Sequence, residues 1–213
     1  MYAMLGTRPD IAYAVGLLGR FSSDPSREHW MAACGVLMYL KHTRTLGIEF
    51  SDGQIELDGF SDADFATSDP SRRRVTSGYC FRLWGGPISW QSKRQPSVSL
   101  ATGDAEYVAL AQAAREAMWL RSLLTELGFA PSRSIKLYGD NQASISIAHN
   151  PVGHTRAKQI DIRFHYLREL VERSVLSIEY VETTAMLADG LTKPLPPVTF
   201  ARFVDMLGLR SRS

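Results

Sequence analysis

Three aspartates lie close together in the segment ELDGFSDADF, residues 56–65, which otherwise has the pattern of a β-strand. Strand side chains alternate between two faces, so Asp58, Asp62 and Asp64 share one face with Phe60. An unpaired buried carboxylate is costly, whereas a charged edge strand protects a sheet from aggregation. The segment taken alone therefore fits a functional site and a solvated edge strand about equally well.

Three further acids, Glu106, Asp140 and Asp189, stand where a fold could carry them to the same place. Glu106 begins an apolar stripe near the start of a long predicted helix, where the helix dipole favours a negative charge. Asp140 ends a predicted strand, at the edge where α/β sheets bind ligands, although a helix N-cap also explains it. Asp189 lies in a short predicted helix, and taken alone it reads as a surface charge.

Four of these carboxylates, those of Asp62, Glu106, Asp140 and Asp189, could meet at one edge of a sheet. Such a cluster repels itself, which raises carboxylate pKa values unless a cation is present. Oxygen ligands favour Mg²⁺ or Mn²⁺ over zinc. Two divalent ions about 4 Å apart would suit in-line displacement at phosphorus, with one activating water and the other stabilising the leaving oxygen.

The elements that must position these acids follow from the hydrophobic pattern. Residues 1–45 predict a helical pair, and consecutive strands are expected at 48–50, 54–62, 75–83 and 87–91, with turns at Asp52-Gly53 and Gly85-Gly86. The remaining elements are expected at 104–127 (helix), 135–138 (strand), 141–149 and 156–173 (helices), 177–181 (strand), 185–191 and 200–207 (helices). Strands first, then strands alternating with helices, favour a mixed sheet over an all-parallel one.

Composition and charge narrow the class of protein. The 213 residues, 45% of them hydrophobic, suffice for one domain with an ordinary core, and the formal net charge of +2 does not by itself indicate a polyanionic partner. Cys34 and Cys80 lack metal-site spacing, which argues against a zinc site or a disulfide scaffold and fits a reducing intracellular compartment. No apolar run approaches the roughly 20 residues of a membrane span, and no secretion signal is recognisable.

Seven blocks follow one another in the order and spacing of a known family. They are GFSDADF (59–65), TSGY (76–79), ISWQSKRQ (88–95), DAEYVAL (104–110), DNQA (140–143), IDIRFH (160–165) and LADGLTKP (187–194). Together they resemble the ribonuclease H domain of copia-type LTR-retrotransposon Pol polyproteins. The segment TRPDIAYA (7–14) is similar to the stretch that links the reverse transcriptase to this domain. The resemblance therefore covers nearly the whole chain.

That resemblance implies an α/β fold of the ribonuclease H type. Its mixed five-stranded sheet has three antiparallel strands followed by two parallel ones, is flanked by helices and is preceded here by the N-terminal helical pair. We expect residues 1–50 to be a helical remnant of the reverse-transcriptase connection, residues 51–195 the ribonuclease H-like domain and residues 196–213 a C-terminal tail. The polymerase Tyr-x-Asp-Asp, the protease and the zinc-binding part of the integrase are missing, so we expect a slice or a degraded remnant of the polyprotein.

The resemblance also implies an activity, which is cleavage of the RNA strand of RNA/DNA hybrids during retrotransposon reverse transcription. Asp62, Glu106, Asp140 and Asp189 correspond to the catalytic acids that hold two Mg²⁺ ions, for which Mn²⁺ can substitute. The implied partners are the hybrid and the reverse transcriptase part of the same polyprotein, and none is a membrane. The expected location is intracellular, either cytoplasmic in a virus-like particle or nuclear.

Contacts with a hybrid are expected mainly at its phosphates, with RNA distinguished by its 2′-hydroxyls. The residues predicted to bind nucleic acid are Lys93, Arg94, Gln95, Asn141, Gln142 and Arg163. The arginines at 72–74 are a weaker choice, because a solvated turn explains them equally well, and His165 could assist product release or simply pack. Asp104 and Gln159 replace the family's usual glutamate and frequent histidine, which bears on substrate contacts and leaves the four acids unchanged.

Two other functions stay open from the sequence. The chain could be a catalytically silent module that binds nucleic acid, or a structural relic of a Pol polyprotein. A transposase or integrase on the same kind of fold is a weaker alternative, because Glu106 precedes Asp140 in the chain and those enzymes place their glutamate late.

Overall fold

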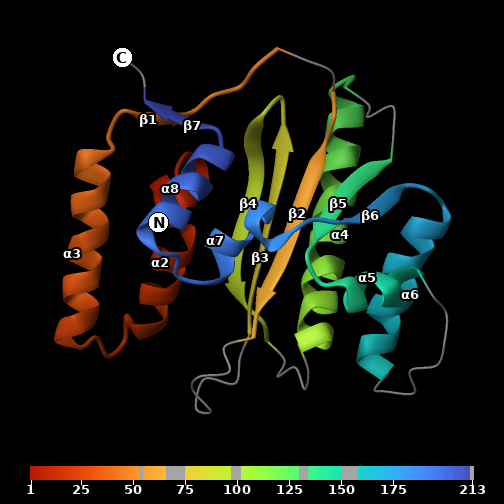
Figure 1. Cartoon of the computed structure of the whole chain (residues 1–213), viewed down its shortest axis with the longest axis horizontal. Coiled ribbons are helices and arrows are strands. Elements are labelled where there is room, and N and C mark those ends of the chain that lie inside the picture. Colours follow the sequence, from red (N-terminus) through yellow and green to blue (C-terminus); the bar gives the residue numbers. More distant parts are fainter. Residues whose placement is uncertain (53–54, 66–74, 97–101, 130–133, 150–157, 212–213) are drawn as a thin grey trace.

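A five-stranded mixed sheet forms the centre of the molecule (Figure 1). The computed structural model describes residues 1–52, 55–65, 75–96, 102–129, 134–149 and 158–211, without the side chains of residues 158–164. The strand order is β4-β3-β2-β5-β6, from β2 (Asp58–Asp64), β3 (Thr76–Leu83), β4 (Gly86–Arg94), β5 (Ile135–Gly139) and β6 (Leu176–Tyr180). β2, β3 and β4 pair antiparallel, whereas β5 pairs parallel with both β2 and β6. The predicted mixed sheet is confirmed.

Helices cover both faces of this sheet, because the strands direct alternate side chains to opposite sides. Tyr79 and Phe81 on one face pack in a core with α4 (Thr102–Glu126), α5 (Gln142–His149) and α6 (Lys158–Glu172). Phe60 and Cys80 on the other face pack in a second core with Leu191 of α7 (Asp189–Thr192). Figure 1 shows α7 lying across the strands on the side opposite α4. The first residues of α4 and of α7 therefore reach the sheet from opposite sides.

The N-terminal segment forms the predicted helices. Its elements are α1 (Tyr2–Gly6), the 3₁₀ turn η1 (Pro9–Ile11), α2 (Ala12–Leu18), the 3₁₀ turn η2 (Gly19–Phe21) and α3 (Arg27–His42). α3 begins with a capping box, in which the backbone N–H of His29 donates to the Ser26 hydroxyl and that of Ser26 donates to His29 Nδ1. α2 contacts β4 and lies on the α7 side of the sheet.

The segment that follows α3 pairs with the C-terminal segment in a separate small sheet. β1 (Leu46–Ile48) pairs antiparallel with β7 (Leu209–Ser211), which follows the 3₁₀ turn η4 (Thr183–Ala185), α7 and α8 (Pro197–Met206). The expectation that a strand at 48–50 opens the meander is wrong, because its backbone pairs with the distant C-terminal segment instead. The last predicted helix is confirmed as α8. The division of the chain at residues 50 and 195 stays a prediction.

Two broader expectations concern the cysteines and the membrane. Cys34 and Cys80 are both free thiols, and Cys80 is buried. Among the described helices, none has the combination of length and apolar character that crossing a bilayer demands.

Candidate active site

Three of the four predicted acids converge at one end of the sheet. Asp62, Glu106 and Asp140 each offer a carboxylate oxygen, and these oxygens lie within 4.8 Å of one another. Phe60 of β2 pairs with Tyr138 of β5, and Asp62 and Asp140 each lie two residues further along the chain, Asp62 within β2 and Asp140 directly after the end of β5. Glu106 comes from the beginning of α4. The ends of two neighbouring parallel strands and the start of a helix therefore build this cluster, as such edges commonly do in α/β sheets.

Burial and mutual repulsion favour the protonated form of Asp62 and Glu106 when no cation is bound. Asp62 exposes 4% of its surface and Glu106 exposes 6%. Burial raises the pKa of Asp62 most strongly, and the charges of Asp189 and Asp140 raise it further. Burial likewise raises the pKa of Glu106 to about 9, with added repulsion from Asp62 and Asp140. Three clustered oxygen donors of this kind fit Mg²⁺ or Mn²⁺, whose positive charge would offset both effects.

Asp140 does not cap the helix that follows it. The N-cap interaction of α5 comes from Asn141, whose Oδ1 accepts a hydrogen bond of 3.0 Å from the backbone N–H of Ser144. Asp140 instead accepts a hydrogen bond of 2.9 Å from the hydroxyl of Thr183. The structural alternative for Asp140 is therefore wrong, and its carboxylate faces the acid cluster. Asn141, predicted as a nucleic-acid contact, has its side-chain oxygen engaged in the cap.

Asp189 lies beside the cluster and outside the group of three. It is the first residue of α7 and exposes 8% of its surface, so it is not the surface charge that its sequence context allowed. Its Oδ1 pairs with Lys193 Nζ at 2.9 Å. Burial raises the pKa of Asp189, whereas Lys193 lowers it. Within the part of the chain that the structure describes, Asp62, Glu106 and Asp140 form no ion pair, so three acids stay open to a cation.

Two residues that sequence reasoning did not single out complete this site. Thr192, fully buried, donates a hydrogen bond from its hydroxyl to Oδ2 of Asp62. Burial lowers the pKa of Lys193, but Asp189, Asp62 and Asp140 outweigh burial and raise it overall. Thr192 follows Asp189 by three positions and Lys193 follows it by four. Because this spacing places side chains on one helical face, it could have indicated both residues as neighbours of Asp189.

A glycine opposite Asp62 allows α7 to pack closely against the sheet. Gly78 of β3 pairs with Asp62 in the β2–β3 register. A β-carbon at Gly78 would lie 2.7 Å from the Leu191 β-carbon and 2.9 Å from the γ-methyl of Thr192. The close approach of α7 therefore depends on the missing side chain, as is usual where a glycine interrupts a strand.

The predicted nucleic-acid contacts at the end of β4, Lys93, Arg94 and the following Gln95, separate into two kinds. Lys93 and Arg94 are exposed, and they pair with Ser77 and Thr76 at the end of the sheet that carries the acids. Gln95 exposes only 1% of its surface, and its Nε2 donates to Ser77 Oγ at 2.7 Å and to the Ala105 carbonyl at 2.9 Å. This placement supports a positioning role, because Gln95 ties β3 to the turn of α4 that carries Glu106.

The other predicted contacts are only partly described. Gln142 is exposed at the start of α5, two residues after Asp140. Arg163 belongs to α6, but its side chain lies outside the described residues, as do the arginines at 72–74. Asp58, on the same strand face as Asp62, pairs with Arg82 at 3.5 Å, so its charge has a structural partner away from the cluster.

Comparison with known proteins shows that the chain is similar to parts of Pol polyproteins from transposons. No protein-family model matches it. It is 40% identical over 211 residues to the retrovirus-related Pol polyprotein from transposon TNT 1-94 of Nicotiana tabacum, a match that covers 99% of this chain and 16% of that protein. It is also 40% identical over 204 residues to the corresponding polyprotein from transposon RE1 of Arabidopsis thaliana, covering 95% of this chain and 14% of that protein. The chain thus spans a minor part of these relatives.

Among solved structures, LC11-RNase H1 in complex with an RNA/DNA hybrid is similar to the chain. The TM-score is 0.47 and the sequence identity 14%, over 64% of this chain and 94% of that chain.

Proposed function

The chain belongs to the retrovirus-related Pol polyproteins of transposons, and from that premise we propose that it is a metal-dependent ribonuclease H, which hydrolyses the RNA strand of RNA/DNA hybrids during reverse transcription. The observation that supports this proposal most is the group of buried Asp62 and Glu106 with half-buried Asp140, whose carboxylate oxygens lie within 4.8 Å of one another. A fold would not keep three repelling acids together at the end of its central sheet for stability alone. Their arrangement suits a reaction that needs divalent cations.

Each residue of the site has a distinct part in this proposal. Asp62, Glu106 and Asp140 would hold the metal, and Asp189 would join them from α7 once released from Lys193. Two Mg²⁺ ions, when bound, supply charge stabilisation at the attacking and leaving oxygens of an in-line displacement. Thr192 orients the carboxylate of Asp62 through its hydroxyl. Gln95 fixes the start of α4 and thereby the position of Glu106.

Substrate binding in this proposal falls to the exposed side chains around the acids. Lys93 and Arg94 reach phosphates of the hybrid, because both are exposed at the acid-bearing end of the sheet. Gln142, next to Asp140 and Asn141, is placed for polar contacts with the RNA strand. Arg163 remains a proposed contact from the sequence.

The wider setting is proposed from the relatives. The reverse transcriptase part of the same polyprotein would deliver the hybrid, and residues 1–50 would connect the two parts. The proposed location follows that of reverse transcription, in a cytoplasmic virus-like particle or in the nucleus.

Substrate choice tests this function. The purified chain is incubated with a 5′-labelled RNA paired to DNA, with the same RNA paired to RNA, and with a DNA duplex of the same sequence. The proposal predicts cleavage of RNA in the hybrid alone, dependent on Mg²⁺ or Mn²⁺ and stopped by EDTA. Equal cleavage of the RNA duplex, or no cleavage of the hybrid with either metal, would refute it.

A silent nucleic-acid-binding module is the second candidate. The observation that favours it is the ion pair of Lys193 with Asp189, which supplies an internal cation beside the acids. This candidate predicts hybrid binding that EDTA does not change, together with no turnover. The substrate experiment therefore separates the two functions.

A further inference from the structure

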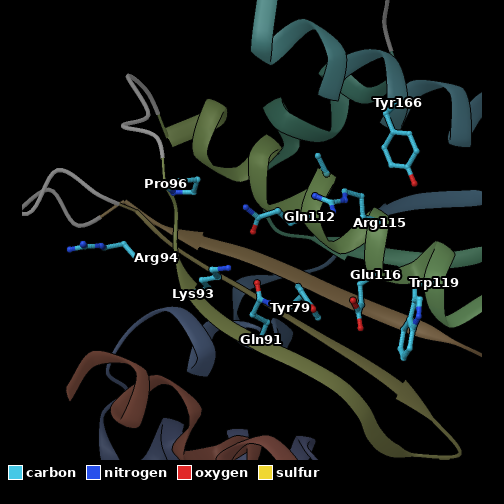
Figure 2. Close-up of a pocket in the computed structure, with 11 residues that line it drawn as sticks. Tyr79, Gln91, Lys93, Arg94, Pro96, Gln112, Arg115, Glu116, Trp119 and Tyr166 are labelled. Carbon is cyan, nitrogen blue, oxygen red and sulfur yellow. The ribbon is translucent and has the colours of Figure 1, made fainter. Parts of the chain in front are cut away.

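A groove of about 810 Å³ runs between the edge strand β4 and one flank of α4 (Figure 2). It lies on the face of the sheet that packs against α4, because Tyr79 in its lining belongs to that core. In Figure 2, Lys93 and Arg94 lie toward one end of the groove and Trp119 toward the other, with Arg115 between them. None of the acids at the candidate active site lines this groove.

The charges along the groove suit a polyanion. Lys93, Arg94 and Arg115 are exposed, and within the described part of the chain none of the three forms an ion pair. Glu116 is the acid in the lining, and its Oε1 accepts a hydrogen bond of 2.6 Å from the hydroxyl of Ser89. Three cations thus face one carboxylate that already has a partner. A row of phosphates would supply the missing counter-charges.

An exposed aromatic ring distinguishes the groove from a purely basic surface. Trp119 exposes 56% of its surface, although a tryptophan usually buries most of its area. It follows Arg115 by four residues, so the indole and the guanidinium lie on the same face of α4. Tyr166 of α6 adds a second ring to the lining. A positive groove with exposed rings is typical of surfaces that bind single strands, whose unpaired bases can stack.

The strand register connects the groove to the acid cluster. Lys93 pairs with Ser77, which pairs in turn with Ala63, the neighbour of Asp62 on β2. The basic end of the groove therefore lies at the same end of the sheet as the acids. From that end the groove leads away along α4 toward Trp119.

We propose that this groove binds an unpaired nucleic-acid strand, RNA or DNA, that continues from a hybrid held at the acid cluster. Lys93 and Arg94 hold phosphates where the hybrid ends and the unpaired strand begins, Arg115 contacts phosphates further along the unpaired strand, and a base stacks on Trp119. The position of this strand rests on the proposed ribonuclease H function, but its binding needs neither metal nor cleavage. A duplex does not fit this role, because its base faces are already stacked.

The test compares hybrids with and without a single-stranded overhang. Fluorescein-labelled RNA/DNA hybrids, either blunt or extended by twelve unpaired nucleotides of RNA or of DNA, are titrated with the full chain in EDTA, and Kd is measured by fluorescence anisotropy. The overhang should tighten binding about tenfold, since stacking of one base contributes about 1–3 kcal/mol. The RNA and DNA arms show which strand the groove prefers.

Matched variants assign the effect to the groove. Arg115→Gln with Trp119→Ala should remove the overhang's advantage. Arg27→Gln with Trp30→Ala changes the same residue types on the exposed face of α3 and should leave the advantage intact. Circular dichroism checks that both double variants are folded. Equal affinity for blunt and extended hybrids, or an advantage that survives in the first double variant, overturns the proposal.

Two further measurements distinguish strand binding in the groove from binding of an acidic protein segment and from hybrid cleavage. Poly-glutamate that displaces the overhang as well as an oligonucleotide of equal charge would assign the groove to an acidic protein segment and overturn the proposal. Cleavage of the blunt hybrid in Mg²⁺ is measured in parallel with the parent chain. An overhang effect without cleavage supports the groove and refutes the proposed function, whereas cleavage without an overhang effect does the reverse.

Discussion

Gly78 lies directly opposite Asp62 across the β2–β3 ladder, and its missing side chain is what lets α7 rest on the sheet. Through this contact the hydroxyl of Thr192 reaches the carboxylate of Asp62. The same contact holds Asp189 beside the other acids. One backbone position without a side chain thus determines how a late helix joins the site.

Replacing Gly78 with alanine should therefore destabilise the protein. The new β-carbon would meet the β-carbon of Leu191 at 2.7 Å and the backbone oxygen of Ala188 at 3.3 Å, and neither atom is the free end of a flexible side chain. Overpacking of this kind costs about 1–3 kcal/mol in the free energy of unfolding, measured by urea denaturation. Hybrid cleavage should fall as well, because α7 carries Thr192 and Asp189 away from Asp62.

The same substitution at Gly35 is the matched control. Gly35 is exposed within α3, and a β-carbon there would meet no atom within 4 Å. Gly35→Ala should stabilise the protein by about 0.5–1 kcal/mol, because alanine favours a helix more than glycine does. Equal effects of the two substitutions would contradict the role assigned to Gly78.

Thr192→Val tests the hydrogen bond to Asp62 at nearly constant volume. The Asp62 carboxylate would lose a buried donor, which costs about 1–3 kcal/mol of stability. This hydrogen bond lowers the pKa of Asp62, so its loss should raise that pKa further. Because the hydroxyl also holds the carboxylate in position, its loss should weaken Mg²⁺ binding in a calorimetric titration. Thr192→Ser keeps the hydroxyl and should restore Mg²⁺ affinity, so a valine variant that binds Mg²⁺ like the parent would exclude this role.

The raised pKa of Glu106 predicts how the free energy of unfolding changes with pH when EDTA removes divalent ions. Its pKa of about 9 in the folded protein exceeds the ordinary value of 4.5, so the folded state holds a proton that the unfolded chain releases. The free energy of unfolding should therefore fall as pH rises from about 4.5 to about 9, with a slope of up to about 1.4 kcal/mol per pH unit. Urea denaturation at pH 5 to 9 measures this slope.

Glu106→Gln removes one titrating group and should reduce that slope, and the slope that remains comes from Asp62, whose pKa burial also raises. Glu126→Gln, a substitution of the same type at the exposed end of α4, should leave the slope unchanged. Adding Mg²⁺ should stabilise the parent most at high pH, where protons compete least with the metal. A slope that is the same in the parent and in Glu106→Gln would show that this carboxyl is not held protonated.

Lys193→Met removes the internal cation and keeps a side chain of similar length. Lys193 pairs with Asp189 at 2.9 Å and lowers the pKa of both Asp62 and Glu106. Without this charge, the acids repel one another more strongly, so stability in EDTA should fall, whereas Mg²⁺ affinity should rise a few-fold. Lys41→Met, on the exposed surface of α3, should change neither quantity. Weaker Mg²⁺ binding in Lys193→Met would mean that the lysine assists the metal.

Local patterns in the sequence predicted a mixed sheet and an edge where the central acids could meet, whereas the arrangement of the five strands came from the family resemblance. The pattern of residues 54–62 predicts a strand with Asp62 on one face, although the strand in the structure runs from Asp58 to Asp64. The helical stripe that begins at Glu106 brings this glutamate to that strand. The strand before Asp140 predicts a carboxylate at the sheet edge. These signals are local in the chain, and the parallel pairing of β2 with β5 brings them together.

Contacts between distant segments could not be predicted in the same way. The pairing of β1 with β7 joins segments that are far apart in the sequence, and no local pattern marks it. Lys93 and Gln95 differ by two positions and would share a strand face, yet the strand ends at Arg94 and the chain turns Gln95 inward. Thr192 reaches Asp62 only because Gly78 leaves room for α7 against the sheet. This relationship depends on packing, so no periodic pattern in the sequence indicates it.

The central claim is that metal held by the buried acids drives hydrolysis of RNA in a hybrid. The initial rate of hybrid cleavage in Mg²⁺, measured for the parent and for Asp62→Asn, tests it most directly. Outer-shell partners of metal ligands typically contribute 10- to 100-fold, so loss of a direct ligand should lower the rate by at least about a hundredfold. The account predicts cleavage by the parent and that loss in the variant. A parent that does not cut, or a variant that cuts at the parent's rate, would contradict it.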